Sequence, residues 1–135
     1  MKNNQTRLLM ILAVLIITAL ACEGSFSTAN ISDAWMSTDQ EGDQRTTTFA
    51  PDEIFYAQVD LNNAPEDTSV RVVWIAEDVE DTEPEFQMNE FEYVGDEGGL
   101  FFELENSDYL WPNGQYRVDI YLNGEFDRSL SFSVQ

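Results

Sequence analysis

From residue 31 onward, short runs of residues alternate between apolar and polar, and turn residues separate the runs. Successive side chains of a β-strand point to opposite faces, so a period of two is typical of half-buried strands. No run has the convincing spacing of an amphipathic helix. The pattern predicts strands at residues 31–37, 46–50, 54–61, 69–76, 85–94, 100–104, 115–122 and 125–134. Seven or eight strands at this spacing predict one all-β domain, a sandwich of two packed sheets.

The alternation also predicts which side chains face the core of the sandwich. The predicted inward positions are Phe55, Ala57, Val59 and Leu61, then Val70, Val72, Trp74 and Ala76, then Tyr116, Val118, Ile120 and Leu122, and finally Phe126, Leu130, Phe132 and Val134. The phase of the alternation changes near Asn89, where we expect a bulge or a break. Asn123-Gly124 predicts a type I′ hairpin turn, because both residues tolerate a positive φ.

The N-terminus has a different pattern. Residues 8–20 are apolar except for Thr18, and Lys2 and Arg7 precede them. Thirteen residues are too few for a bilayer span, which needs about 20. A short basic start, an apolar run and small residues after it are typical of a secretory signal. Cys22, which is the only cysteine of the chain, follows directly.

Residues 19–22 (ALAC) resemble the lipobox of bacterial lipoproteins, although the leucine stands one position late. The resemblance implies a diacylglycerol on the Cys22 thiol and a location in the cell envelope, on the outer side of the cytoplasmic membrane or in the outer membrane. The alternatives are plain secretion after cleavage at Ala21 and an uncleaved membrane anchor. The predicted organisation is a signal peptide at residues 1–21, a tether at 22–30 and a domain at 31–135.

Residues 113–118 (NGQYRV) resemble the G-x-Y-x-C segment of immunoglobulin-like domains, with Val118 in the position of the cysteine. Val59 or Ala57 stands where the first cysteine of such domains would be. The resemblance implies an antiparallel sandwich of about seven strands, similar to bacterial immunoglobulin-like and fibronectin-III-like modules without a disulfide. It also implies that Tyr116 forms a tyrosine corner, in which its hydroxyl bonds the backbone upstream.

Charge narrows the possible partners and activities. Residues 22–135 have four arginines and 26 acidic residues, hence a net charge of −22, with no lysine or histidine. This charge repels nucleic acids and anionic lipid headgroups, so we expect no nucleic-acid partner. Without histidine or lysine, most pairs of nucleophile and base cannot form, nor can zinc sites of cysteine and histidine. Carboxylate pairs such as those of glycosidases remain possible, but they need a cleft, which a small sandwich rarely forms. We therefore predict a protein that is not an enzyme and needs no resident cofactor.

Two acidic segments are candidate calcium sites, because clustered loop carboxylates can supply the six to eight oxygens that calcium prefers. One segment has Glu77, Asp78, Glu80, Asp81 and Glu83, and the other has Asp39, Glu41 and Asp43. Neither segment has the spacing of an EF-hand loop. The alternative is a solvated charged surface that also keeps a sheet edge from pairing with other chains.

Three aromatic residues, Tyr109, Trp111 and Tyr121, do not share the phase of the predicted core. Exposed aromatics could bind carbohydrate or protein, whereas Trp111 could instead cap the open end of the core. The sequence therefore predicts a non-catalytic, lipid-anchored module that binds an envelope protein or glycan, or an accessory subunit of a surface assembly. The alternative is a calcium-dependent carbohydrate- or protein-binding module that uses the acidic loops.

Overall fold

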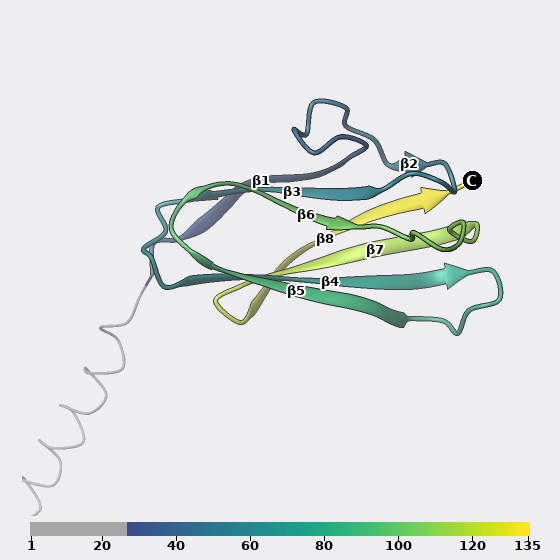
Figure 1. Cartoon of the computed structure of the whole chain (residues 1–135). Coiled ribbons are helices and arrows are strands. Elements are labelled where there is room, and N and C mark those ends of the chain that lie inside the picture. Colours follow the sequence, from purple (N-terminus) through teal and green to yellow (C-terminus); the bar gives the residue numbers. More distant parts are fainter. Residues whose placement is uncertain (1–26) are drawn as a thin grey trace, which may run out of the picture.

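The computed structural model describes residues 27–135, which form eight strands in two facing sheets (Figure 1). The predicted signal peptide, Cys22 and residues 23–26 of the tether lie outside the described residues. One sheet has the order β1 (Asn30–Ser37), β3 (Phe55–Asn62), β6 (Gly98–Leu104). The other sheet has the order β2 (Thr48–Phe49), β8 (Glu125–Val134), β7 (Gly114–Leu122), β4 (Thr68–Val79), β5 (Phe86–Gly95). The predicted all-β sandwich is confirmed.

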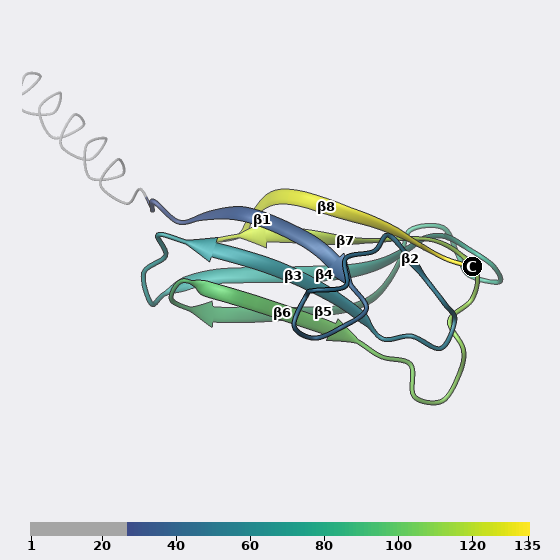
Figure 2. The same cartoon turned by 90° about the horizontal axis from the view of Figure 1, so that it is seen from above.

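The two sheets differ in width, since three strands face five. Neighbouring strands are antiparallel, except that the two-residue β2 runs parallel to the end of β8. The loop at residues 38–47 carries the chain from β1 in one sheet to β2 in the other. Seen from above, β1 and β8 run along the same side of the sandwich (Figure 2). No helix of residues 27–135 has the length and apolar composition needed to cross a bilayer.

Two local predictions about the backbone are confirmed. Asn123 and Gly124 have φ values of 49° and 81°, the pair of positive values that a type I′ turn needs. The break expected near Asn89 is a bulge at the adjacent residue. Trp74 pairs with Asn89 whereas Ile75 pairs with Gln87, so Met88 is the extra residue of β5.

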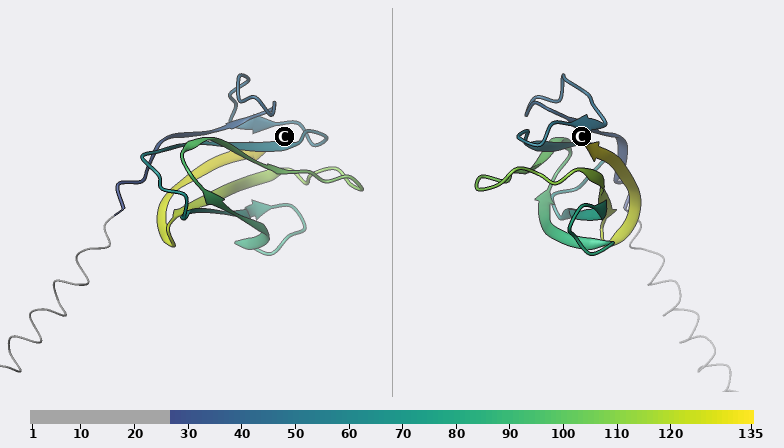
Figure 3. Two further views of the ribbon diagram at one scale, coloured as in Figure 1. Left: turned by 60° about the vertical axis from the view of Figure 1, so that its left-hand side comes forward. Right: turned by 90° about the vertical axis from the view of Figure 1, so that its right-hand side faces the viewer.

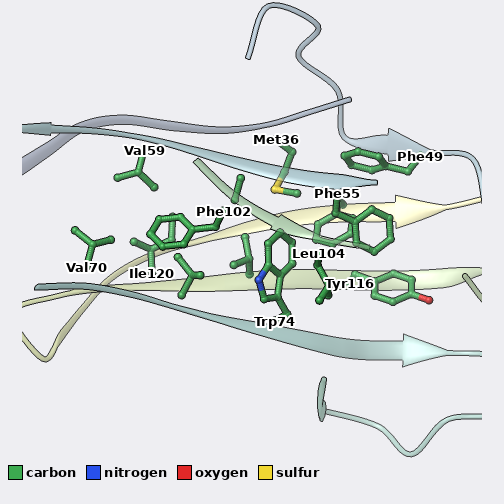
Figure 4. Packing of buried hydrophobic residues seen from close by; sticks show 14 of the residues in the cluster. Met36, Phe49, Phe55, Val59, Val70, Trp74, Phe102, Leu104, Tyr116 and Ile120 are labelled. Carbon is green, nitrogen blue, oxygen red and sulfur yellow. The ribbon is translucent and has the colours of Figure 1, made fainter. Parts of the chain in front are cut away.

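Trp74 lies at the centre of the core, between the two sheets (Figure 4). Its side chain is fully buried, and its ring stacks on Phe55 with 6.3 Å between centroids and meets Phe132 edge-on at 6.2 Å. The inward positions predicted in β3, and those predicted in β4, are all buried. A buried Trp in such a core stabilises a fold by about 3–5 kcal/mol relative to Ala. Trp74 therefore joins the two sheets through side-chain packing, since Phe55 belongs to β3 and Trp74 to β4.

The predicted inward position of Phe126 is wrong. Ile120 pairs with Arg128 whereas Tyr121 pairs with Phe126, so Asp127 is an extra residue in β8. A bulge reverses the alternation of the residues that precede it. The Phe126 ring consequently lies 59% exposed, with its centroid 5.7 Å from that of Tyr121 on the outer face of the five-stranded sheet.

The predicted tyrosine corner is present. The Tyr116 hydroxyl donates to the backbone carbonyl of Pro112 at 2.7 Å, and the residue is almost entirely buried. The Tyr116 ring stacks on Phe132 with 5.5 Å between centroids. Burial disfavours the charged phenolate and raises the pKa of Tyr116 from 10.0 to about 12. The corner therefore ties the loop before β7 to the core.

The raised pKa of Tyr116 predicts a loss of stability at high pH. The neutral phenol is favoured in the fold, so its contribution is complete below pH 10 and falls as pH rises toward about 12. Tyr116→Phe should lower the free energy of unfolding by about 1 kcal/mol at neutral pH, because the hydrogen bond to Pro112 is lost. Urea unfolding should also show a shallower decline for this variant between pH 10 and 12 than for the parent protein.

Tyr109→Phe is the matched control, because Tyr109 is 78% exposed. Its free energy of unfolding should stay within about 0.5 kcal/mol of the parent value. Equal losses in the two variants would contradict the structural role of the Tyr116 hydroxyl.

Candidate functional site

A groove opens between β1 and β8, where the two sheets meet without a shared strand. Its volume is about 570 Å³. The residues that line it come from β1, from the loop at 38–47 and from β8, and they are Ala34, Trp35, Met36, Arg45, Thr46, Thr47, Ser129, Leu130 and Ser131. None of them is acidic, although the domain as a whole is strongly acidic. The groove is therefore a local exception to the charge of its surroundings.

The edge of β8 supplies free backbone groups to this groove. The N–H of Ser133 donates to the carbonyl of Thr47 at 2.8 Å, so this residue directs its backbone toward β2. Backbone direction alternates along a strand, so Ser131 and Ser129 direct theirs to the same side. Among the described residues, β2 pairs with β8 only at Ser133 and Val134. The N–H and carbonyl groups of Ser129 and Ser131 therefore face the groove without a partner strand.

Hydrogen bonds fix both ends of the groove. At one end, the Arg128 guanidinium donates to the carbonyl of Ile31 at 2.7 Å, which links β8 directly to β1. At the other end, the N–H of Thr46 donates to the carbonyl of Met36 at 3.0 Å, just before the chain enters β2. The width of the groove is thus held at one end by a contact between the two sheets and at the other end by a contact between the loop and β1.

Trp35 and Arg45 form one rim of the groove. The indole N–H of Trp35 donates to the carbonyl of Gly42 at 2.9 Å. The Arg45 guanidinium lies 3.9 Å from the centroid of the Trp35 ring and pairs with Asp33 at 3.2 Å. Both side chains are therefore held in place, and the ring face of Trp35 is covered by a cation.

The loop at residues 38–47 is itself anchored to the outer face of the three-stranded sheet. Gln58 is buried, and its side-chain amide donates to the Ser37 hydroxyl at 3.1 Å and to the Gln40 carbonyl at 3.0 Å. Gly42 passes directly over this amide with a φ of 78°, and a Cβ there would lie 2.8 Å from the Gln58 side chain. The rim of the groove thus depends on a glycine and a buried glutamine that alternation alone does not predict.

A polar network covers the outer face of the five-stranded sheet. Arg117 pairs with Glu85 and with Asp119, whose carboxylate also accepts the Ser129 hydroxyl. Burial lowers the pKa of Arg117, but the hydrogen bond to Glu85 and the charge and hydrogen bond of Asp119 outweigh burial and raise it. The charged arginine therefore compensates the carboxylates beside it. Through Asp119 and Ser129, this network also holds the outer face of β8.

The structure separates the two acidic segments of the sequence. Glu77 and Asp78 lie in β4, and Glu80, Asp81 and Glu83 lie between β4 and β5. Glu77 pairs with Arg117 at 3.4 Å. Asp39, Glu41 and Asp43 lie in the loop at 38–47, on the other sheet, where the Asp39 carboxylate accepts the N–H groups of Asp43 and Gln44.

Because the two acidic segments lie on different sheets, they cannot be assumed to share one metal ion. Within residues 27–135, no three histidine, cysteine, aspartate or glutamate side chains come together in a way that could hold a metal ion. The calcium hypothesis nevertheless stays a prediction.

The candidate binding aromatics also lie apart. Trp111 caps the core, since its ring stacks 4.5 Å from Phe55 and its indole N–H donates to the Glu53 carbonyl at 3.0 Å. Tyr109 is highly exposed in the same loop, which projects from the sandwich between β6 and β7 (Figure 3). Tyr121 lies on the outer face of the five-stranded sheet, with the Arg71 guanidinium 4.1 Å from its ring centroid. These residues do not form one site.

Sequence reasoning did not find the groove. Its walls come from strands that are distant in sequence. These strands have unpaired edges because of their positions in the two sheets, and residue type does not reveal those positions. One signal was available in the sequence: Ser129, Ser131 and Ser133 alternate with apolar residues and are short and uncharged in an acidic chain. Trp35 beside Arg45 carries no such signal, because the contact spans a loop.

Comparison with known proteins places the fold. An immunoglobulin-like protein from Pseudomonas aeruginosa superposes with a TM-score of 0.54 and 16% identity, over 82% of this chain and 99% of that one. The fold is immunoglobulin-like. The fold class implied by the NGQYRV segment and the predicted sandwich is thereby confirmed. No family model matches the chain, and no curated protein matches it.

Two larger enzymes contain a similar unit. An alkylpurine DNA glycosylase from Pseudomonas fluorescens matches with a TM-score of 0.53 and 16% identity, over 81% of this chain and 31% of that one. A β-glucosidase from Listeria innocua matches with a TM-score of 0.51 and 13% identity, over 80% of this chain and 16% of that one. At these identities the matches establish the fold alone, because one fold serves many functions.

The calcium hypothesis has a direct test. A calcium site predicts that millimolar calcium chloride raises the melting temperature beyond the value in sodium chloride of equal ionic strength, because a ligand that binds only the folded state stabilises it. Both salts screen the repulsion among the carboxylates, so the sodium series is the necessary reference. Equal melting temperatures in the two series would contradict the hypothesis.

Proposed function

We propose that this chain is a non-catalytic interaction module of a bacterial cell envelope, held at the membrane by a lipid on Cys22. Its partner binds in the groove between β1 and β8. The observation that carries the proposal is the groove itself, which combines apolar side chains with unpaired backbone groups between two sheets. Binding sites of this kind join an apolar surface to a few polar groups that fix orientation.

The groove is suited to binding because its walls are already formed. Arg128, Thr46 and Gln58 hold the strands and the loop around it through hydrogen bonds to other elements. A site that needs no ordering on association loses less conformational entropy when its partner binds. An immunoglobulin-like sandwich is compatible with this role, because its strands present edges and loops on a rigid frame.

The tether limits where the partner can be. The eight residues from Cys22 to Ala29 can span at most about 28 Å when fully extended. A lipidated Cys22 would carry two acyl chains, which give stable membrane attachment, whereas one chain gives only marginal binding. The module would therefore work close to the membrane surface. Its net negative charge keeps the domain away from anionic headgroups.

The anchor is tested by Cys22→Ser. We expect the variant to move from the membrane fraction to the soluble fraction of the cell envelope or the medium, because the serine hydroxyl cannot take the diacylglycerol. Fractionation followed by immunoblotting measures the change, and metabolic labelling with palmitate shows whether the parent protein carries lipid. Retention of the variant in membranes would favour an uncleaved anchor instead.

The groove is tested by capture from a solubilised envelope extract of the producing organism. Residues 23–135 are coupled to beads through the N-terminus, and Thr47→Trp is compared with the parent chain. Thr47 is exposed and lines the groove, so the tryptophan should fill it without disturbing the core. We expect Thr47→Trp to lose at least nine-tenths of the captured partner, as measured by quantitative mass spectrometry.

Ser107→Trp serves as the control, because Ser107 is exposed in the loop between β6 and β7 and does not line the groove. This variant should capture as much partner as the parent chain. Loss of capture by Ser107→Trp alone would move the binding surface to the projecting loop. Capture of nothing by the parent chain would refute the proposed function.

A further inference from the structure

We infer that the partner in the groove is a polypeptide in extended conformation, which pairs with the free edge of β8 as an added strand. The inference rests on the proposed function and names the chemistry of the partner. The segment has an uncharged centre in which apolar residues alternate with small polar ones, and basic residues flank this centre.

The backbone of β8 defines the first requirement. Ser129 and Ser131 direct their N–H and carbonyl groups into the groove, two residues apart, which is the spacing at which a neighbouring strand offers its own groups. β2 already occupies the same edge at Ser133 and Val134. An added strand would extend the line of β2 along β8. Main-chain hydrogen bonds of this type supply affinity in known strand additions, and side-chain pockets supply specificity.

The side chains of the groove define the second requirement. Met36 is buried and Ala34 and Leu130 are partly buried, so the groove has an apolar floor between its two edges. Apolar side chains at every second position of an added strand would point toward this floor. Buried charge in such a strand would have no partner, because Arg45 is already paired with Asp33 and no carboxylate lines the groove. The centre of the segment is therefore uncharged.

The charge of the domain defines the third requirement. Residues 22–135 contain four arginines and 26 acidic residues, whereas the groove lacks acidic side chains. Long-range attraction by this field accelerates the approach of a basic partner and repels an acidic one. Basic residues on either side of the central segment would lie outside the groove and face these carboxylates.

The geometry favours a polypeptide over a glycan. Sugar rings pack against open aromatic faces, and the aromatic ring at the rim of the groove is Trp35, whose face is covered by Arg45 at 3.9 Å. Tyr121, on the outer face of the five-stranded sheet, is covered in the same way by Arg71 at 4.1 Å. Free amide and carbonyl groups along a strand edge instead match another backbone.

The test uses the whole domain, residues 23–135, and a phage-displayed library of random peptides of about twelve residues. We expect enrichment of peptides with alternating apolar residues and basic ends. Ser131→Pro removes the N–H of Ser131, and proline is tolerated at a strand edge that faces outward. This variant should bind the enriched peptides at least tenfold more weakly. Ser107→Pro, in the exposed loop outside the groove, is the control and should bind them as the parent does.

Hydrogen exchange supplies a measurement that does not depend on a variant. The N–H groups of Ser129 and Ser131 should exchange more slowly when an enriched peptide is bound. If Ser131→Pro melts at a lower temperature, Thr47→Trp replaces it, since that residue lines the groove without belonging to β8. The enriched peptide should then bind Thr47→Trp at least tenfold more weakly than it binds the parent chain.

Several results would overturn the inference. The library could enrich no peptide, or it could enrich peptides with acidic ends. The enriched peptides could bind Ser131→Pro and Thr47→Trp with the affinity that they have for the parent chain. Bound peptide could also slow hydrogen exchange outside β8 and not in β8. The proposed function has a separate test, the capture from envelope extract, and it fails if the parent chain captures nothing there. A partner captured through the groove that is a glycan would leave the proposed function standing and overturn the inference.

Discussion

Packing of five aromatic rings between the sheets is the interaction on which the rest of the structure depends. Phe49, Phe55, Trp74, Tyr116 and Phe132 come from five strands. The rings that contact one another have centroids 4.8–6.3 Å apart, and Phe55 and Phe132 each contact the other four. Such pairs add to the free energy of burial that each ring contributes by itself. Because this cluster joins one sheet to the other through side chains, the sandwich does not need strand pairing around its whole circumference. Strands at the edges of the sheets can therefore remain unpaired without loss of the packing between the sheets.

The open edge at β1 and β8 follows from the way the chain changes sheets. Residues 38–47 leave the three-stranded sheet, fold back over Gln58 and Trp35, and reach β8 only at Ser133. β2 is then two residues long, because the chain before it turns toward β1, where the N–H of Thr46 donates to the carbonyl of Met36. Since β2 runs parallel to β8, Ser131 and Ser129 lie beside this N-terminal side of β2. A longer β2 would cover Ser131 and Ser129 and fill the groove. The groove is thus a consequence of one short strand, and the hydrogen bonds at its two ends keep its walls apart.

The sequence predicted the parts of the fold that are local and repetitive. Alternation located the strands, Trp74 and Tyr116 marked the core and the corner, and Asn123-Gly124 marked the hairpin, because each follows from neighbouring residues. Phe126 was misplaced because the bulge at Asp127 has no residue signal of its own. The groove was missed because it requires knowing which edges meet in space. Burial of Gln58 was missed because a loop distant in sequence covers it.

The point where the tether enters the fold has a mechanical consequence. With an anchor at Cys22, tension between the membrane and a bound partner would act on β1, which pairs with β3 from Asn30 to Ser37 with one irregularity between Ile31 and Asp33. A pull along the axis of β1 loads these hydrogen bonds simultaneously, in shear, instead of opening them one after another. The bond from Arg128 to Ile31 adds a clamp across the neighbouring edge. Resistance to force would therefore be concentrated at the strand that joins the proposed anchor to the proposed binding groove.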